Sequence, residues 1–480
     1  MLVITQLIYL VGYALAADPV VKVLNGSYSG LHLPQFKQDL FLGMPFAQDT
    51  GEANRFRIPQ SLNETWHGIR PAIQYGDACP DNEPDADAAY GMSENCLSIN
   101  IVRPSECQGK LPVMFWIHGG SYQVGTSGLS YYNLTYIVQR SVEIGKPMIA
   151  ASINYRKGGW GNMYSIEIQG SGNTNLALRD MRMGLAWVQE NIAAFGGDEE
   201  SVTIWGESAG SFAVGQLLMS YGGRTDGLFH RSIQESGSAA TAWYNGSDWY
   251  QPIYQGIVDD AGCTDAIDTL ECLRTVPYKE LYPLLNQSRL VGAPGWYPTV
   301  DGDVIPNFPT TMLEEGRFAH IPHLYGSNSD EGTDNAPFGI DTDEDLETYL
   351  LKDTGFQFPP SAVSRILELY PDEPSEGVPI NTGDRRFVKE GRQYKRVAAI
   401  VGDVFYHATR LNDARYYSKC SPTYIYRFNT RPYENDTSTY LAPAYKGVEH
   451  FSEVAFVFNN PESVGPWPEY RALSNDMSDM

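Results

Sequence analysis

A serine lies between two glycines directly after an alternating apolar run, in the stretch TIWGESAGS (203–211). The five residues around Ser208 fit the pattern G-x-S-x-G, in which a sharp strand-to-helix turn exposes a nucleophilic hydroxyl. The following helix would direct its N-terminal N–H groups at negative charge that develops on a substrate. The alternative interpretation is a glycine-rich turn with no catalytic role. The sequence on either side has to distinguish the two interpretations.

A second glycine-rich stretch, IHGGSYQVG (117–125), also follows an apolar run. Attack of a serine on an ester carbonyl creates an oxyanion, which backbone N–H groups of such a loop can hold. The loss of one such donor costs about 10²–10³ in rate in a comparable hydrolase. The N–H of Ala209, next to Ser208, is a further candidate donor.

Both stretches depend on strands and helices that alternate along the chain. LPVMFWIHGG (111–120), KPMIAASINYR (146–156), SVTIWG (201–206) and HIPHLYGSNSDEG (320–332) are predicted strands with their following loops. LALRDMRMGLAWVQENIAAFGG (176–197) has helical apolar spacing and a glycine stop. This alternation predicts an α/β fold with a mostly parallel central sheet and helices on both faces. Sites in such sheets lie beyond the carboxyl ends of the strands, where each motif falls.

The composition is globular, with 42% apolar and 19% charged residues in 480, and the formal net charge is −24. So acidic a surface repels phosphate backbones, which argues against nucleic acid as a partner. No run is long enough to cross a bilayer. Residues 1–16 end in small-x-small Ala-Leu-Ala before a polar segment, which predicts a signal peptide and a secreted protein, and leaves 17–480 as a single domain.

Export would allow disulfides and N-glycosylation. The six cysteines permit fifteen connectivities, of which the short loops Cys79–Cys96 and Cys263–Cys272 are the simplest; Cys107 and Cys420 are left over. Six N-x-Ser/Thr sequons predict a glycosylated surface. They begin at Asn25, Asn63, Asn133, Asn245, Asn286 and Asn435.

Eight segments in chain order resemble one family. They are FLGMPFAQ, RFRIP, SENCLSIN, HGGSYQVG, FGGDEESVTIWGESAGS, GLFHRSIQESGS, DGDVIP and GSNSDEGT. From about residue 20 to 478 the chain is similar to type-B carboxylesterases and lipases of the α/β-hydrolase fold, which include cholinesterases. The resemblance implies a serine carboxylic-ester hydrolase that forms an acyl-enzyme and needs no cofactor or metal, with an ester and water as its partners.

The fold places the nucleophile, the acid and the histidine in that order along the chain. His407 and His450 come late enough; His407 has a helical apolar context that suits a core residue, whereas His450 lies in the loop KGVEHFSE and matches the family's context. In GSNSDEGT, proximity does not separate Asp330 from Glu331, but the family uses the glutamate. The expected catalytic residues are therefore Ser208, Glu331 and His450.

The resemblance also implies which residues surround the three catalytic side chains. The oxyanion donors are expected on Gly120, Ser121 and Ala209, with Ser121 where the family usually has glycine. Trp243 and Tyr122 are expected in the substrate pocket, and Ser236 and Glu207 in support of the catalytic groups. A large ring at Trp243 would favour small or flat acyl groups.

The loop between Cys79 and Cys96 is short, acidic and free of tryptophan. It lacks the apolar face of an interfacial lid and the ring that would stack on choline. We therefore expect small to medium soluble esters as substrates. A lipase-like member, an acyl-transferring member and a catalytically inactive binding ectodomain remain as alternatives. Family members typically continue beyond the segment resembling LSNDM, so this chain either has a naturally short C-terminus or is truncated there.

Overall fold

The structure is a computed structural model, and it describes residues 18–81, 91–106, 109–286, 295–353, 358–434 and 441–480. The predicted signal peptide, Cys107 and the sequon at Asn435 lie outside these residues, as does most of the loop between Cys79 and Cys96.

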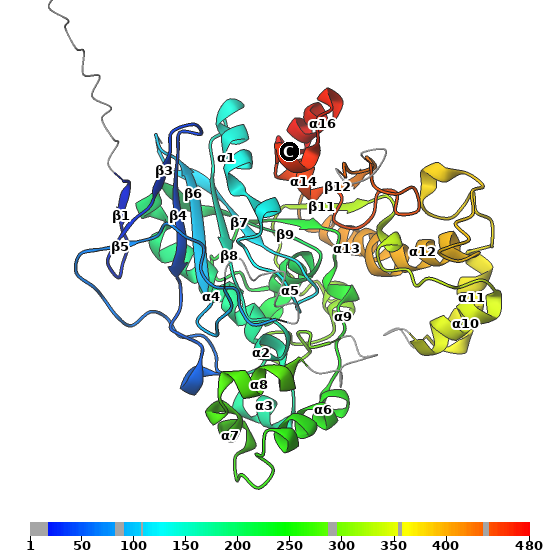
Figure 1. Ribbon diagram of the computed structural model, residues 1–480, viewed down its shortest axis with the longest axis horizontal. Coiled ribbons are helices and arrows are strands. Elements are labelled where there is room, and N and C mark those ends of the chain that lie inside the picture. Colours follow the sequence, from blue (N-terminus) through cyan, green and yellow to red (C-terminus); the bar gives the residue numbers. More distant parts are fainter. Residues whose placement is uncertain (1–17, 82–90, 107–108, 287–294, 354–357, 435–440) are drawn as a thin grey trace, which may run out of the picture.

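A large twisted sheet forms the centre of the molecule (Figure 1). Among the described residues it has nine strands in the order β12-β11-β10-β9-β7-β8-β6-β4-β3. The strands from β12 to β8 pair in parallel, whereas β6, β4 and β3 complete the sheet with antiparallel pairs. The bounds are β3 (Leu31–Leu33), β4 (Gln38–Pro45), β6 (Ser98–Pro104), β7 (Leu111–Ile117), β8 (Ile149–Ile153), β9 (Gly197–Glu207), β10 (Arg231–Glu235), β11 (His323–Asn328) and β12 (Thr423–Phe428). A small separate sheet consists of β1 (Val20–Lys22), β2 (Ser27–Ser29) and β5 (Ile69–Pro71). The predicted fold class is therefore confirmed.

Helices cover both faces of the large sheet. Their bounds are α1 (Leu134–Glu143), α2 (Gly158–Asn162), α3 (Ile166–Ser171), α4 (Leu176–Asn191), α5 (Ala209–Gly223), α6 (Ser247–Asp260), α7 (Thr269–Thr275), α8 (Tyr278–Leu285), α9 (Pro309–Glu314), α10 (Asp343–Thr348), α11 (Pro360–Leu369), α12 (Tyr394–Gly402), α13 (Ala408–Tyr417), α14 (Val454–Val457), α15 (Pro461–Val464) and α16 (Pro468–Ser478).

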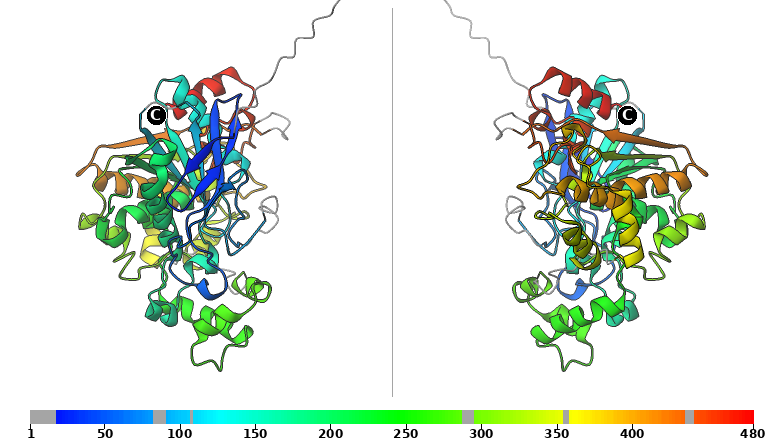
Figure 2. Two further views of the ribbon diagram at one scale, coloured as in Figure 1. Left: turned by 90° about the vertical axis from the view of Figure 1, so that its left-hand side faces the viewer. Right: turned by 90° about the vertical axis from the view of Figure 1, so that its right-hand side faces the viewer.

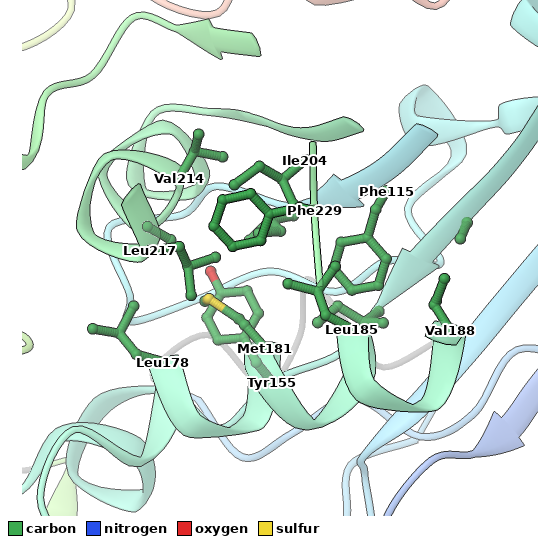
Figure 3. Packing of buried hydrophobic residues seen from close by; sticks show 14 of the residues in the cluster. Phe115, Tyr155, Leu178, Met181, Leu185, Val188, Ile204, Val214, Leu217 and Phe229 are labelled. Atoms are coloured by element: carbon green, nitrogen blue, oxygen red, sulfur yellow. The ribbon is translucent and has the colours of Figure 1, made fainter. Parts of the chain in front are cut away.

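The side chains of successive residues in the central strands point to opposite faces of the sheet. Phe115 and Ile204 pack in a core with α4 and α5, whereas their neighbours Trp116 and Trp205 pack in a second core with α1 and α14. Figure 3 shows the first of these cores, with α4 contributing Met181 and other apolar side chains beneath the strands. Buried on both faces, these strands are apolar almost throughout, as parallel strands are.

Two further groups of helices lie outside the sheet. Helices α6, α7 and α8 form a separate core with α2 and α3, at the end of the molecule opposite α16 (Figure 2). A disulfide between Cys263 and Cys272 joins α6 to α7, and a second joins Cys79 to Cys96, so both expected disulfides are present. Helices α10, α11 and α12 enclose another small core.

Candidate active site

Ser208 occupies the sharp turn between β9 and α5. Its backbone has φ +55° and ψ −123°, a strained combination for a residue with a side chain, and its side chain is only half-buried. The flanking glycines are required by space: a Cβ on Gly210 would lie 2.0 Å from the carbonyl oxygen of Ile117, and one on Gly206 would lie 2.6 Å from the backbone of Gly210. The turn therefore presents the hydroxyl beyond the carboxyl end of the sheet.

The loop after β7 lies directly against this turn. A Cβ on Gly119 would lie 3.0 Å from Cβ of Ser208, and Gly120 (φ +99°) could carry no side chain because Val124 O is 2.2 Å away. Ser121 adopts φ +55°. Within the described part of the chain, no group accepts a hydrogen bond from the N–H of Gly120, Ser121 or Ala209. Three free donors thus gather around Ser208, as an oxyanion site requires.

Glu331 follows β11 and is completely buried. Its Oε1 accepts hydrogen bonds from Ser236 Oγ at 2.5 Å and from the N–H of Asn328 at 2.6 Å, and its Oε2 lies 2.7 Å from His450 Nδ1. Burial opposes the charge of Glu331, but the hydrogen bonds and His450 outweigh it and lower its pKa. This carboxylate is therefore held ionised and fixes the imidazole.

The other ring nitrogen of His450 faces Glu207 rather than the serine. Nε2 lies 3.1 Å from Glu207 Oε1, and it makes no hydrogen bond among the described residues, including to Ser208. Burial opposes the positive charge of His450, yet Glu207 and Glu331 raise its pKa from 6.5 to about 10. Burial raises the pKa of the Glu207 carboxyl and His450 opposes this shift, so the two buried groups compete for one proton.

Glu453, the last residue of the loop KGVEHFSE, was not among the residues expected at the site. It is fully buried, accepts hydrogen bonds from Ser236 Oγ at 3.3 Å and from Asn328 Nδ2, and its pKa is raised to about 7 by burial and by Glu331. Its spacing three residues after His450 was the available signal.

Aromatic rings form the wall beside the histidine. The ring of Tyr406 lies 4.7 Å from that of His450. Trp243 contacts Tyr297 at 4.9 Å and Phe405 at 5.4 Å between ring centroids. Tyr406 and Phe405 both come from a π-helical segment, η9 (Asp403–His407), which lets neighbouring residues reach different parts of the wall. Sequence reasoning missed both.

Three further residues that the sequence analysis considered are held by hydrogen bonds to the surrounding fold. Tyr122 is completely buried, and its hydroxyl donates to Gln216 Oε1 at 2.5 Å, so it lies behind the wall. Asp330, the alternative acid considered beside Glu331, accepts hydrogen bonds from the N–H groups of Ile380 and Val448, and so holds the segment that leads to His450. His407 lies 3.1 Å from Ser327 through Nδ1.

Neither a metal site nor a membrane span is evident in the part of the chain that the structure describes. No group of three or more His, Cys, Asp or Glu side chains there is arranged to bind a metal ion. No helix there is long and apolar enough to cross a membrane.

Comparisons with known proteins identify the family and the fold. The profile of the carboxylesterase family matches residues 17–480. Secreted lipase 1 of Botryotinia fuckeliana is 33% identical over 96% of this chain and 82% of its own length. The inactive carboxylesterase-like protein VdtD of Byssochlamys spectabilis is 31% identical over 88% of this chain and 75% of its own. The crystal structure of EstA from Aspergillus niger superposes with a TM-score of 0.80 at 28% identity, covering 94% of this chain and 84% of that one.

Proposed function

The chain belongs to the carboxylesterase family, and from this premise we propose that it is a secreted serine carboxylic-ester hydrolase. The observation that carries the proposal is the convergence, at the carboxyl end of one sheet, of a strained, accessible Ser208, three unpaired N–H donors, and a histidine bonded to a buried carboxylate.

The proposed reaction has two halves. Ser208 Oγ attacks the ester carbonyl carbon while His450 Nε2 takes its proton, and the N–H groups of Gly120, Ser121 and Ala209 hold the oxyanion. Collapse breaks the bond to the alcohol, which leaves with the proton from His450. Water then attacks the acyl-enzyme by the same route and releases the acid. Glu331 keeps its charge and stabilises the imidazolium.

His450 must first be neutral and turn from Glu207 toward Ser208. The distance of 3.1 Å between Nε2 and Glu207 makes Glu207 a competitor for the imidazole. Glu207 directly precedes Ser208, so the competing carboxylate and the nucleophile are neighbours in the same turn.

Small to medium esters are the proposed substrates, because Trp243, Tyr297 and Phe405 pack closely where the acyl group would lie. Similar proteins are named lipases, so longer esters are the alternative. A series of p-nitrophenyl esters from acetate to palmitate distinguishes the two: a maximum of kcat/KM at eight carbons or fewer supports the proposal, and one at twelve or more favours a lipase. Export and glycosylation at the sequons are tested by intact mass before and after glycosidase treatment.

The second candidate is a catalytically inactive member. It is favoured by the missing hydrogen bond between His450 and Ser208, and a similar protein is named inactive. Mass spectrometry after incubation with a reactive organophosphonate ester separates the two, with Ser208→Ala as the control. One adduct on the Ser208 peptide, absent from the control, supports the esterase. No adduct on folded protein supports the inactive member.

A further inference from the structure

A cavity of about 360 Å³ reaches the catalytic acid candidate from a side that Ser208, His450 and Trp243 do not line. Asp403 and His407, one helical turn apart on η9, contribute to its wall, whereas Tyr406 between them contacts His450. The cavity has buried Glu331 in its floor and exposed Leu411 at its rim. We call it the Arg410 cavity, after the side chain discussed next.

Arg410 lines this cavity, and its guanidinium lacks an ion pair within the described part of the chain. Its side chain is only 6% exposed, its Nε makes no hydrogen bond, and none of the described residues forms an ion pair with it. A buried charge in this state is costly, and native proteins normally pair it. A guanidinium without an ion pair that lines an open cavity is therefore suited to bind an anion.

A second guanidinium strengthens the positive charge. Arg427 of β12 lines the same cavity and donates through Nε to Ser329 Oγ and through Nη2 to Ser329 O, both at 3.1 Å, but forms no ion pair with any described carboxylate. Burial lowers the pKa of Arg410, and the neighbouring Arg427 lowers it further. The two cations thus repel each other across a space that an anion could fill.

Glu331 attracts Arg410 and acts to raise its pKa, but no described carboxylate of the cavity forms an ion pair with either guanidinium. Glu331 is engaged by His450, Ser236 and Asn328. Asp403 accepts a hydrogen bond from the Tyr370 hydroxyl at 2.6 Å, and Glu376 lies exposed at the rim.

The lining also includes several aliphatic side chains, which bear on which anion fits. Val378, Ile380, Ala398, Ala399 and Leu411 form this part of the wall. At about 30 Å³ per water the cavity would hold about a dozen waters, which is ample room for a medium-sized organic acid. Hydrocarbon in contact with this wall is favourable, whereas an inorganic oxyanion would leave it unused.

We propose that the Arg410 cavity binds an organic carboxylate, with the carboxylate on the guanidinium groups of Arg410 and Arg427 and the hydrocarbon against Val378, Ile380 and Leu411. Guanidinium groups suit this role because they bind carboxylates through two parallel hydrogen bonds. Acids of this class are also what an esterase releases. That link rests on the proposed function, whereas the binding itself does not.

The test is isothermal titration calorimetry of the full chain with octanoate, octanol and inorganic phosphate at equal ionic strength. We expect saturable octanoate binding that weakens at least tenfold in Arg410→Gln and severalfold in Arg427→Gln, with Arg410→Lys between the wild type and Arg410→Gln. Arg415→Gln, an exposed arginine of the same helix, serves as the matched control and should bind normally. Octanol and phosphate should each bind at least tenfold more weakly than octanoate.

These titrations distinguish binding in the Arg410 cavity from binding above Ser208 and from binding of any oxyanion. Octanoate held above Ser208 would keep its affinity in Arg410→Gln, so unchanged binding in that variant overturns the proposal, as does the absence of binding to the wild type. Phosphate binding as tight as that of octanoate would overturn the assignment to an organic acid. Folding is checked by thermal unfolding without ligand, and Arg410→Gln should not lower the Tm, because it removes an unpaired buried charge. If Arg410→Gln does not fold, the Arg427→Gln and Arg410→Lys titrations decide.

Discussion

At the residue scale, the central feature is an imidazole between two buried carboxylates. Glu331 holds Nδ1 of His450, and Glu207 lies at Nε2, where a serine hydroxyl should be during catalysis. The first contact supports base catalysis because it orients the ring. The second opposes it, because a negative charge at Nε2 favours the imidazolium, which cannot accept a proton.

We therefore predict that Glu207→Gln moves the acid limb of the kcat/KM profile to lower pH. The substitution removes the charge that raises the pKa of His450 toward about 10, so the imidazole becomes neutral at a lower pH. The measurement is kcat/KM for a p-nitrophenyl ester between pH 5 and 10. Glu315→Gln, an exposed carboxylate far along the chain, is the control. An acid limb that stays in place would show that Glu207 does not control His450.

Glu453 gives a prediction for stability. Its pKa is raised from 4.5 to about 7 in the folded protein, so between these values the folded state binds more protons than the unfolded state. Stability contributed by this carboxyl group is then lost as the pH rises through that window, by at most about 3 kcal/mol. Glu453→Gln should unfold at a Tm that depends less on pH between 4.5 and 7. A pH dependence identical to that of the wild type would contradict this.

At the scale of elements, the site depends on how closely the turn after β9 approaches the end of β7. Gly210 in the first turn of α5 lies against the carbonyl of Ile117. This contact brings the loop with the free N–H groups to within reach of Ser208. The same approach explains why the glycines of the motif recur on both sides of the serine.

Gly210→Ala should therefore damage both stability and activity. The added methyl group would meet Ile117 O at 2.0 Å, and the expected cost is about 1–3 kcal/mol or more. Gly170→Ala is the matched control, since this glycine of α3 has nothing within 4 Å of the position of its Cβ; it should raise stability by about 0.5–1 kcal/mol. The measurements are urea unfolding and kcat/KM. Equal effects of the two substitutions would mean that the turn can relax.

At the scale of the whole molecule, buried ion pairs tie the sheet to the helices around it. Arg156, just after β8, binds Asp180 of α4 through two hydrogen bonds of 2.6 and 2.8 Å, and it also donates to the carbonyl of Arg57. Both charged side chains are almost fully buried, at 4% and 0% exposure. Three segments distant in the sequence thus meet at one guanidinium.

We predict that Arg156→Met destabilises the protein by about 3–5 kcal/mol, because Asp180 is left as an unpaired buried charge. Arg365→Met breaks the exposed pair with Glu368, whose side chains are 65% and 66% exposed, and should cost less than about 1 kcal/mol. Chemical denaturation measures both. A small loss for Arg156→Met would show that water reaches Asp180.

Local sequence patterns predicted the main elements and most of the residues of the proposed chemistry. Apolar runs predicted the central strands, and the glycine stop after α4 is present at Gly196, with φ +86°. These signals are local, since they depend on periodicity and on backbone conformations that only a few residues adopt. The pentapeptide around Ser208 and the glycine loop are local for the same reason. The resemblance to a known family supplied the choice of Glu331 and His450.

The way in which the candidate residues face one another depends on tertiary packing. Asn328, Ser236 and Glu453 come from three separate segments, and nothing in their spacing indicates that they share hydrogen bonds. Glu207 faces His450, and Tyr122 lies behind the pocket wall, because of packing between elements distant in sequence. The unpaired charge of Arg410 is likewise a property of its surroundings. The electrostatic surroundings of a side chain depend on residues that are distant in the sequence. Local sequence patterns therefore do not reveal them.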